Sequence, residues 1–305
     1  MKKNYFILLI FILFISCKPI QKHHNSKLHI LATTGMISDL IKNIGKDRVE
    51  VTALMGPGID PHLYKARISD MAKMFSADII FYNGLHLEAK LTEVLKKMSR
   101  KKHKTITVAV AESIDKSLLR KLDDGQYDMH VWMDISLWMR AAQRILKVLS
   151  QKDPHNSDYY KTNGEKYFKE MQQTHDYIKK QILSIPANKR VLITAHDAFN
   201  YYSAAYGIEV RAVQGVSTDA EASAGDIRNL ADFIAQRKIP AIFVESTVPL
   251  KTIIALQEAV KSRGFAVTTG AELYADALGD THSPAGNYLG MMRYNTDTIV
   301  NALTR

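Results

Sequence analysis

Four side chains of metal-ligand type stand near the ends of predicted strands or the start of a predicted helix. His62 lies in the loop after the second predicted strand, and His130 in "YDMHVWMD" directly precedes a predicted helix. His196 in "LITAHDAF" follows the first predicted strand of the second half, and Asp280 in "ADALGDTHS" lies in a glycine-containing loop beyond the last strand. Ligands of open α/β sheets collect outside the carboxyl ends of the strands, so these residues are candidates for one site. A lone histidine is more often a surface residue or a satisfied core residue, and none of the four is decisive by itself.

The loop that carries His62 is stiff. In "GPGIDPHLYKAR" (56–67), two glycines and two prolines precede the histidine. Glycine admits backbone angles that other residues avoid, proline fixes its own φ, and the residue before a proline is pushed toward an extended conformation. The imidazole is therefore presented from a pre-shaped loop, although a plain turn that ends in a helix cap would give the same sequence.

The elements that must position these residues alternate between short β-rich runs and helical patterns, which predicts α/β architecture with parallel strands. The predicted strands form two sets of four: 27–34, 48–55, 78–83 and 105–110 in the first half, and 190–195, 208–213, 240–246 and 265–269 in the second. This layout predicts two (β/α)4-type lobes, each with a four-stranded, mainly parallel sheet. The length of 305 residues, with 46% hydrophobic residues, is ample for two such cores.

A long helix is predicted between the halves, from about Asn156 to Ser184, with Pro154 before it and Pro186 after it. One narrow apolar stripe runs along this segment, made of Tyr160, Tyr167, Met171, Ile178 and Ile182. At 1.5 Å per residue the helix would be ~40 Å long. Because most of its faces are polar, we interpret it as a rigid strut that joins the two lobes rather than as part of either core. Two lobes and a strut imply a cleft between the lobes.

The first seventeen residues, "MKKNYFILLIFILFISC", have the basic start and apolar run of a secretory signal, and the run is too short to span a bilayer comfortably. Cys17, the only cysteine, stands where a lipoprotein signal would be cut. An uncleaved membrane anchor is the alternative.

The domain plan that follows has five parts. It consists of a signal peptide (1–17), a flexible tether (18–26), an N-terminal lobe (27–153), a linking helix (154–186) and a C-terminal lobe (187–305).

The formal net charge of +10 raises the possibility of an acidic partner such as nucleic acid or acidic lipid. The charges are spread out, however, and the one dense run, "SRKKHK" (99–104), lacks the interleaved aromatic residues that single-stranded nucleic acid needs. We interpret this run as a solvated helix end and expect no nucleic-acid partner.

Six stretches carry a resemblance to a known family: "GIDPHLY", "MHVWMD", "TAHDAFNYY", "VQGVSTDAEAS", "IFVEST" and "ADALGD…YLGMMRYNTDTIV". In this order they resemble the signatures of the zinc- and manganese-binding lipoproteins of ABC importers, the TroA-like group of extracytoplasmic metal receptors. The resemblance runs from about residue 28 to the C-terminus. It implies two α/β lobes bridged by one rigid helix, with the metal held between the lobes.

Position by position, the resemblance implies that His62 and His130 bind the metal from the first lobe, and that His196 and Asp280 bind it from the second. Three neutral imidazoles and one carboxylate suit a divalent first-row ion, and at equal concentration Zn²⁺ should outcompete Mn²⁺. Manganese-dedicated members of the family often carry glutamate at the position of His196. The histidine therefore favours Zn²⁺ as the first choice, with Mn²⁺ close behind.

Several further residues are candidates for supporting roles. Glu245, at the end of a predicted strand, is a candidate to orient an imidazole from the second shell. Asp197 is another, or it simply caps a helix. His282 is a possible substitute ligand, while helix-start and packing roles explain His86 and Glu88 adequately.

The resemblance implies capture of a divalent metal outside the cytoplasmic membrane and its delivery to an ABC permease with its ATPase, without catalysis. The expected protein is a monomeric, exported lipoprotein, periplasmic or on the cell surface, tethered through a lipid on Cys17. One alternative is an exported zinc hydrolase, although the chain has no HExxH or GxSxG motif. The other is a surface adhesin, because some basic, exposed lipoproteins bind host components.

Overall fold

The structure is a computed structural model that describes residues 27–98 and 104–304. The predicted signal peptide, the lipidation site at Cys17, the tether and most of the basic run lie outside the described residues. Within these two ranges, no helix is both long and apolar enough to span a bilayer.

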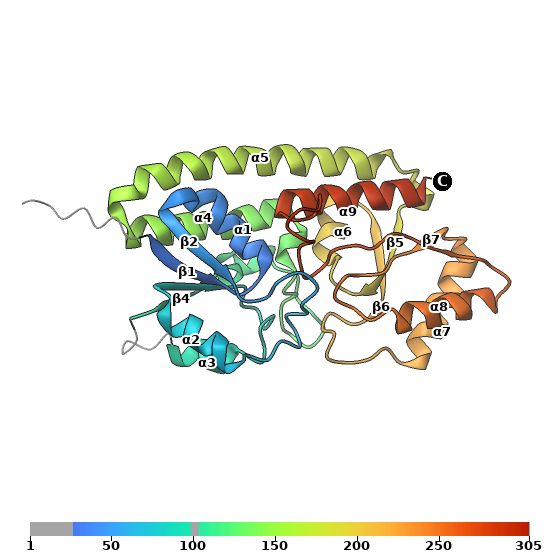
Figure 1. Cartoon of the computed structure of the whole chain (residues 1–305). Helices are drawn as coiled ribbons and strands as arrows, with labels where there is room; N and C mark the ends of the chain where they lie inside the picture. The colour runs from blue at the N-terminus through green and yellow to red at the C-terminus, as the bar shows by residue number, and fades with distance from the viewer. Residues whose placement is uncertain (1–26, 99–103, 305) are drawn as a thin grey trace, which may run out of the picture.

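The first lobe is built on a parallel sheet with strand order β2-β1-β3-β4. Its strands are β1 (Leu28–Ala32), β2 (Val49–Ala53), β3 (Ile79–Tyr82) and β4 (Ile106–Ala109). Helix α1 (Gly35–Gly45) packs its apolar side chains on one face together with α4 (Ile135–Lys152). Helices α2 (Ile68–Ser76) and α3 (Thr92–Met98) cover the other face. All four predicted strands of this half are present, and Figure 1 shows their carboxyl ends directed toward the second lobe.

Local signals explain where helices of this lobe begin. Thr34 caps α1 by accepting a hydrogen bond from the Ile37 N–H. In α2, the carboxylate of Asp70 accepts the Arg67 N–H in a reciprocal capping arrangement.

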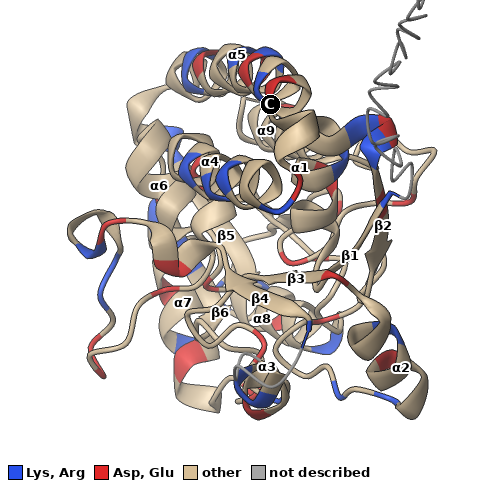
Figure 2. Ribbon diagram, turned by 90° about the vertical axis from the view of Figure 1, so that its left-hand side faces the viewer, with Lys and Arg blue, Asp and Glu red and all other residues tan. Residues whose placement is uncertain are grey.

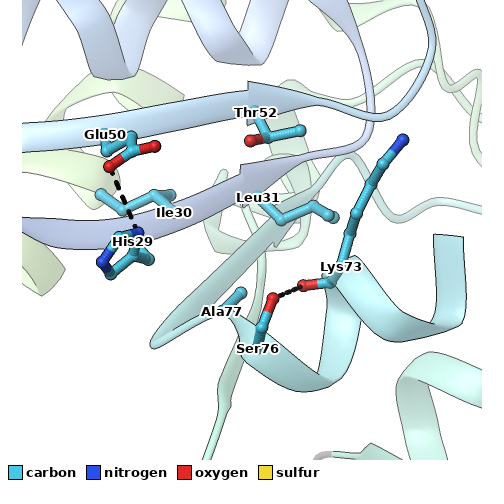
Figure 3. Close-up of a pocket in the computed structure, with 8 residues that line it drawn as sticks. All are labelled: His29, Ile30, Leu31, Glu50, Thr52, Lys73, Ser76 and Ala77. Atoms are coloured by element: carbon cyan, nitrogen blue, oxygen red, sulfur yellow. Dashed lines mark hydrogen bonds and ion pairs between the residues drawn. The ribbon is translucent and has the colours of Figure 1, made fainter. Parts of the chain in front are cut away.

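Edge strand β2 is covered on one face only. Val49 points into the core against α1, whereas Glu50 on the opposite face is exposed. Figure 3 shows the hollow that results between β1, β2 and α2, where an exposed ion pair joins the His29 imidazole and the Glu50 carboxylate at 3.4 Å. This hollow of about 180 Å³ contains none of the predicted ligands.

The second lobe holds its four strands as two parallel pairs. These are β5 (Val191–His196) with β6 (Glu209–Gln214), and β7 (Ala241–Ile242) with β8 (Thr268–Thr269). The backbone N–H of Phe243, next after β7, donates to the Ile193 carbonyl and joins the pairs. Helices α6 (Asn200–Tyr206), α7 (Ala224–Arg237) and α8 (Lys251–Lys261) complete this lobe. The predicted strands 240–246 and 265–269 are present but shorter.

Short 3-10 turns connect several of these elements. They lie at Lys46–Arg48, Ala111–Ser113, Lys116–Leu118, Val131–Met133, Pro154–Asn156 and Ala187–Lys189.

Helix α5 (Ser157–Ser184) runs along both lobes, as Figure 1 shows, and α9 (Tyr288–Leu303) lies beside it. The whole predicted stripe of α5, from Tyr160 to Ile182, is buried. It belongs to one continuous core that includes Trp138 of α4, Tyr202 of α6 and Tyr288 of α9. The helix is therefore a connector, as predicted, but it is also part of the core, because its stripe packs against α4 and α9 rather than standing free. Figure 2 shows charged residues over several outer elements, among them α2, α4 and α5.

Candidate metal centre

His62 is presented by the glycine- and proline-rich loop after β2 and is only 3% exposed. The Asp60 carboxylate accepts the His62 backbone N–H at 2.8 Å through Oδ1, which closes a tight turn directly before the imidazole. Gly58 has a φ of 70°, in the left-handed region that glycine adopts without strain. The sequence thus dictates a fixed backbone at this residue.

His130 lies directly before the 3-10 turn Val131–Met133 and is fully buried. The Asp128 Oδ1 atom accepts the His130 N–H at 2.9 Å and lies 2.8 Å from the imidazole Nδ1. With the proton on Nδ1 donated to this carboxylate, Nε2 keeps a free lone pair. A second support comes from Asn83, which donates to the Met129 carbonyl.

Glu88 holds the loop in which Asn83 lies. Its carboxylate accepts the hydroxyl of Thr33 and the backbone N–H groups of Asn83 and Gly84. Burial raises the pKa of Glu88, although these three hydrogen bonds oppose the shift. Glu88 thus supports the backbone behind His130, a role beyond helix start and packing.

His196 is the last residue of β5 and is fully buried. Glu245 Oε1 accepts the backbone N–H groups of Ala195 and His196, and its Oε2 lies 2.5 Å from the imidazole Nδ1. The predicted supporting residue therefore contacts this histidine directly, on the nitrogen that faces away from the other imidazoles.

The carboxylate beside the three imidazoles comes from Asp276, not from Asp280. Leu273 forms a parallel bridge with Glu245. Asp276 follows three residues later and is buried, with an exposed fraction of 2%. Asp280 is exposed, and its carbonyl accepts the Ser283 N–H in the turn that leads to α9. The prediction of Asp280 is corrected for this reason: Asp276 is buried in the bend that follows the Leu273 bridge, whereas Asp280 is exposed four residues further on.

The structure brings His62, His130, His196 and Asp276 together into one buried group, in which one potential ligand atom from each lies within 4.8 Å of the others. The three Nε2 atoms face the Asp276 carboxylate at 3.5 Å from His62, 3.4 Å from His130 and 3.1 Å from His196. The imidazole ring centroids lie 5.3 to 5.9 Å apart. Residues from four distant parts of the sequence thus converge on one point.

Within the part of the chain that the structure describes, the inward-facing polar atoms of this group are buried without hydrogen-bond partners. All three Nε2 atoms and both Asp276 carboxylate oxygens are buried without a hydrogen-bond partner among the described residues, which is costly for polar atoms removed from water. Burial lowers the pKa of His196, but Glu245 and Asp276 outweigh it and raise this pKa well above its usual value. For Asp276 the two effects have the opposite sign. Burial raises the pKa of this carboxyl, but the neighbouring imidazoles, His196 foremost, hold the pKa well below its usual range.

This arrangement has the chemistry of a cation site. Three imidazole nitrogens and one carboxylate form a borderline-soft set that suits a divalent transition-metal ion. One ion would give all five unpartnered atoms a favourable electrostatic environment at once. On His130 and His196 the outward Nδ1 atoms are already engaged with carboxylates, the arrangement that orients metal-binding histidines.

The remaining candidates lie outside the group. Asp197 is partly buried, its N–H donates to the Gly215 carbonyl, and burial raises its pKa. His282 and His86 are exposed.

Sequence reasoning missed Asp276, Asp60 and Asp128. Two signals could have found them. Asp276 is flanked by apolar residues in "LYADAL", and each first-lobe histidine follows an aspartate at the same spacing, in "DPH" and "DMH".

Comparisons with known proteins agree with this architecture. The family model described as ZnuA, zinc-uptake complex component A, periplasmic, matches residues 30–302. The chain is 45% identical over 276 residues to the zinc-binding protein TroA of Treponema pallidum (strain Nichols), covering 90% of this chain and 89% of TroA. It is 42% identical over 283 residues to the manganese-binding lipoprotein MntA of Bacillus subtilis (strain 168), covering 92% of both.

A solved structure shows the same likeness in three dimensions. The structure of the periplasmic zinc-binding protein TroA from Treponema pallidum superposes with a TM-score of 0.89 at 45% identity. The match covers 92% of this chain and 100% of that one.

Proposed function

Because this chain belongs to the ZnuA family of periplasmic zinc-uptake components, we propose that it captures a divalent metal ion outside the cytoplasmic membrane and delivers it to an ABC importer. Relatives are named as metal-binding proteins and lipoproteins, one for zinc and one for manganese. The observation that carries the proposal is the group of four buried side chains whose inward-facing atoms lack partners. The ion is the cargo, and an ABC permease with its ATPase is the receiving partner.

In this proposal the ligands are His62, His130, His196 and Asp276, and Zn²⁺ is the preferred ion over Mn²⁺. Three nitrogens against one carboxylate support this order, because Zn²⁺ binds such a set more tightly than Mn²⁺ does. Glu245 orients His196 from outside the ligand set.

The proposed division of the chain follows the elements. The N-terminal lobe (27–153) carries β1 to β4, the linking segment (154–186) carries α5, and the C-terminal lobe (187–305) carries β5 to β8 and α9. The proposal also includes a monomer held at the membrane through a lipid on Cys17, supported by the signal-like sequence before it and by relatives named as lipoproteins.

A hydrolase would need a free general base beside the metal. Glu245 is one candidate base, but both of its oxygens are engaged, by two backbone N–H groups and by the His196 imidazole. The geometry therefore favours a binding protein.

The proposal is tested by elemental analysis of protein purified without added metal, followed by competitive titration of Zn²⁺ against Mn²⁺. We expect one ion per chain, with the tighter affinity for Zn²⁺. Loss of an orienting partner alone typically costs 10–100-fold in affinity, so Asp276→Ala should weaken binding by more than about 100-fold.

Asp280→Ala is the matched control, because it removes an exposed carboxylate from the same segment and should leave the affinity unchanged. Equal affinity of wild type and Asp276→Ala would refute the ligand set. Absence of stoichiometric metal binding by the wild type would refute the function itself.

A further inference from the structure

The two first-lobe histidines are held by the same local device. Each follows an aspartate by two residues, and each aspartate accepts the histidine's own backbone N–H through Oδ1. The distances are 2.8 Å for Asp60 and His62, and 2.9 Å for Asp128 and His130. The position of each imidazole therefore depends on where the carboxylate before it is held.

Both carboxylates use their other oxygen to contact the second lobe. Asp60 Oδ2 accepts the Thr218 hydroxyl at 2.6 Å, from the loop that follows β6. Asp128 Oδ2 accepts the Asn200 side-chain amide at 3.2 Å, from the start of α6. The two bonds cross between lobes at separate places, one beside each histidine.

Neighbouring contacts reinforce the second of these places. The Tyr201 hydroxyl donates to the Asp128 carbonyl and accepts the Arg120 N–H. Helix α6 therefore also holds the backbone before His130 through hydrogen bonds. Beside Thr218, by contrast, Lys90 and Asp219 form only an exposed ion pair at 3.6 Å, a kind of contact that contributes little. Among the hydrogen bonds of the described residues, the one from Thr218 therefore links the loop around His62 to the second lobe.

The second-lobe ligands are supported differently. His196 is oriented by Glu245, which comes from its own lobe. Asp276 follows the segment that pairs with Glu245. Among the described residues, no hydrogen bond from the first lobe holds the His196 backbone, whereas the Ala275 carbonyl next to Asp276 accepts the Trp132 indole N–H of the first lobe at 2.8 Å.

We propose that Asp60 and Asp128 are positioning residues that couple contact between the lobes to the presentation of His62 and His130, with Thr218 and Asn200 as the donors that hold them. This inference rests on the proposed metal-binding function. It adds the order in which the ligands let go of the metal ion. When the lobes separate, the first-lobe imidazoles lose their alignment, while His196 keeps its own through Glu245. The ion then loses its first-lobe ligands and dissociates quickly.

The test is the rate of Zn²⁺ release into excess chelator, followed by stopped flow, for Thr218→Val and Thr218→Ser. Valine keeps the shape of threonine and removes the hydroxyl, whereas serine keeps the hydroxyl. We expect roughly 10-fold faster release from Thr218→Val and the wild-type rate from Thr218→Ser. Thr268→Val is the matched control, because it loses a hydroxyl bond to the Pro240 carbonyl within the same lobe and should release metal at the wild-type rate.

A second measurement separates positioning from general loosening. In nitrogen-15 spectra of the imidazoles of the zinc-loaded protein, Thr218→Val should shift or broaden the His62 signals and leave those of His196 unchanged. Equal changes at both histidines, or wild-type release from Thr218→Val, would overturn the inference. Either result leaves the proposed function standing as long as the wild type binds one Zn²⁺, whereas failure of that binding removes the function first.

Discussion

A proton and a metal ion compete for the same nitrogen of His196. The carboxylates of Glu245 and Asp276 raise the pKa of this imidazole well above its usual value of about 6.5. In the metal-free protein the charged form therefore stabilises the fold below the ordinary pKa, and this contribution is lost as the pH rises through the raised one. Metal binding requires the proton to leave Nε2, so affinity increases with pH over the same window.

We therefore expect the rise in Tm on addition of Zn²⁺ to be larger at about pH 8 than at about pH 6. Thermal unfolding of metal-free and zinc-loaded protein across this range measures it. Glu245→Gln, which removes one of the two carboxylates responsible, should flatten the dependence. A Tm increase that is independent of pH in the wild type would contradict this account.

At the scale of single residues, the sequence predicted three members of the buried group and misassigned the fourth. The histidines could be found because each lies beside a recognisable strand, turn or helix start. Asp276 and Asp280 stand in the same short stretch, and the pairing of Leu273 with Glu245 shows which of them lies closer to the second-lobe strands. That pairing joins segments far apart in the chain, so local spacing does not reveal it.

Among the elements, α5 depends on close contact with α4. Gly164 is buried on the face of α5 toward α4, and a Cβ atom there would lie 3.1 Å from Leu146 Cδ2. A larger side chain at this position would therefore press on Leu146, which must shift to admit it.

We expect Gly164→Leu to lower the free energy of unfolding of the metal-free protein by about 1–3 kcal/mol, measured by urea denaturation. Gln173→Leu, at an exposed position of the same helix, should change it by less than about 0.5 kcal/mol. Equal effects of the two substitutions would show that the helices do not pack as described.

The elements themselves were largely predictable. Every predicted strand is present, and α5 begins at Ser157 and ends at Ser184, close to the expected bounds, because prolines mark both sides. The extent of strand pairing in the second lobe was not predictable from the sequence. The apolar run 240–246 has strand character throughout, but regular pairing with β8 ends where β7 ends, and beyond it the run is joined by isolated contacts such as the Leu273 N–H to the Val244 carbonyl.

On the scale of the whole molecule, the two lobes share their largest core. One core runs from the inner face of the first sheet through α4, α5 and α9 to residues of the second lobe such as Leu192 and Phe243. Interlobe hydrogen bonds add to it, including the Trp132 indole N–H to the Ala275 carbonyl at 2.8 Å. The spacing of apolar residues predicted the buried stripe of α5. It did not predict that residues of both lobes pack against this stripe, because the spacing does not identify the side chains that the stripe contacts.

We expect the metal-free protein to unfold in a single cooperative transition, with equal calorimetric and van't Hoff enthalpies in scanning calorimetry. Each lobe also has a smaller core of its own, but the shared core is larger, so partial unfolding would expose apolar surface on both sides. Two resolved transitions would instead mean that each lobe is stable alone.

Both tryptophans of the chain are buried, and Trp132 lies beside His130 of the candidate metal centre. The ring of Trp132 lies 5.2 Å from that of His130 and 6.2 Å from that of Trp138, measured between centroids. A change in the charge or orientation of this imidazole alters the surroundings of an indole directly. The ultraviolet fluorescence of the unlabelled protein is therefore a natural optical readout of whether the centre is filled, usable in real time without attaching a dye.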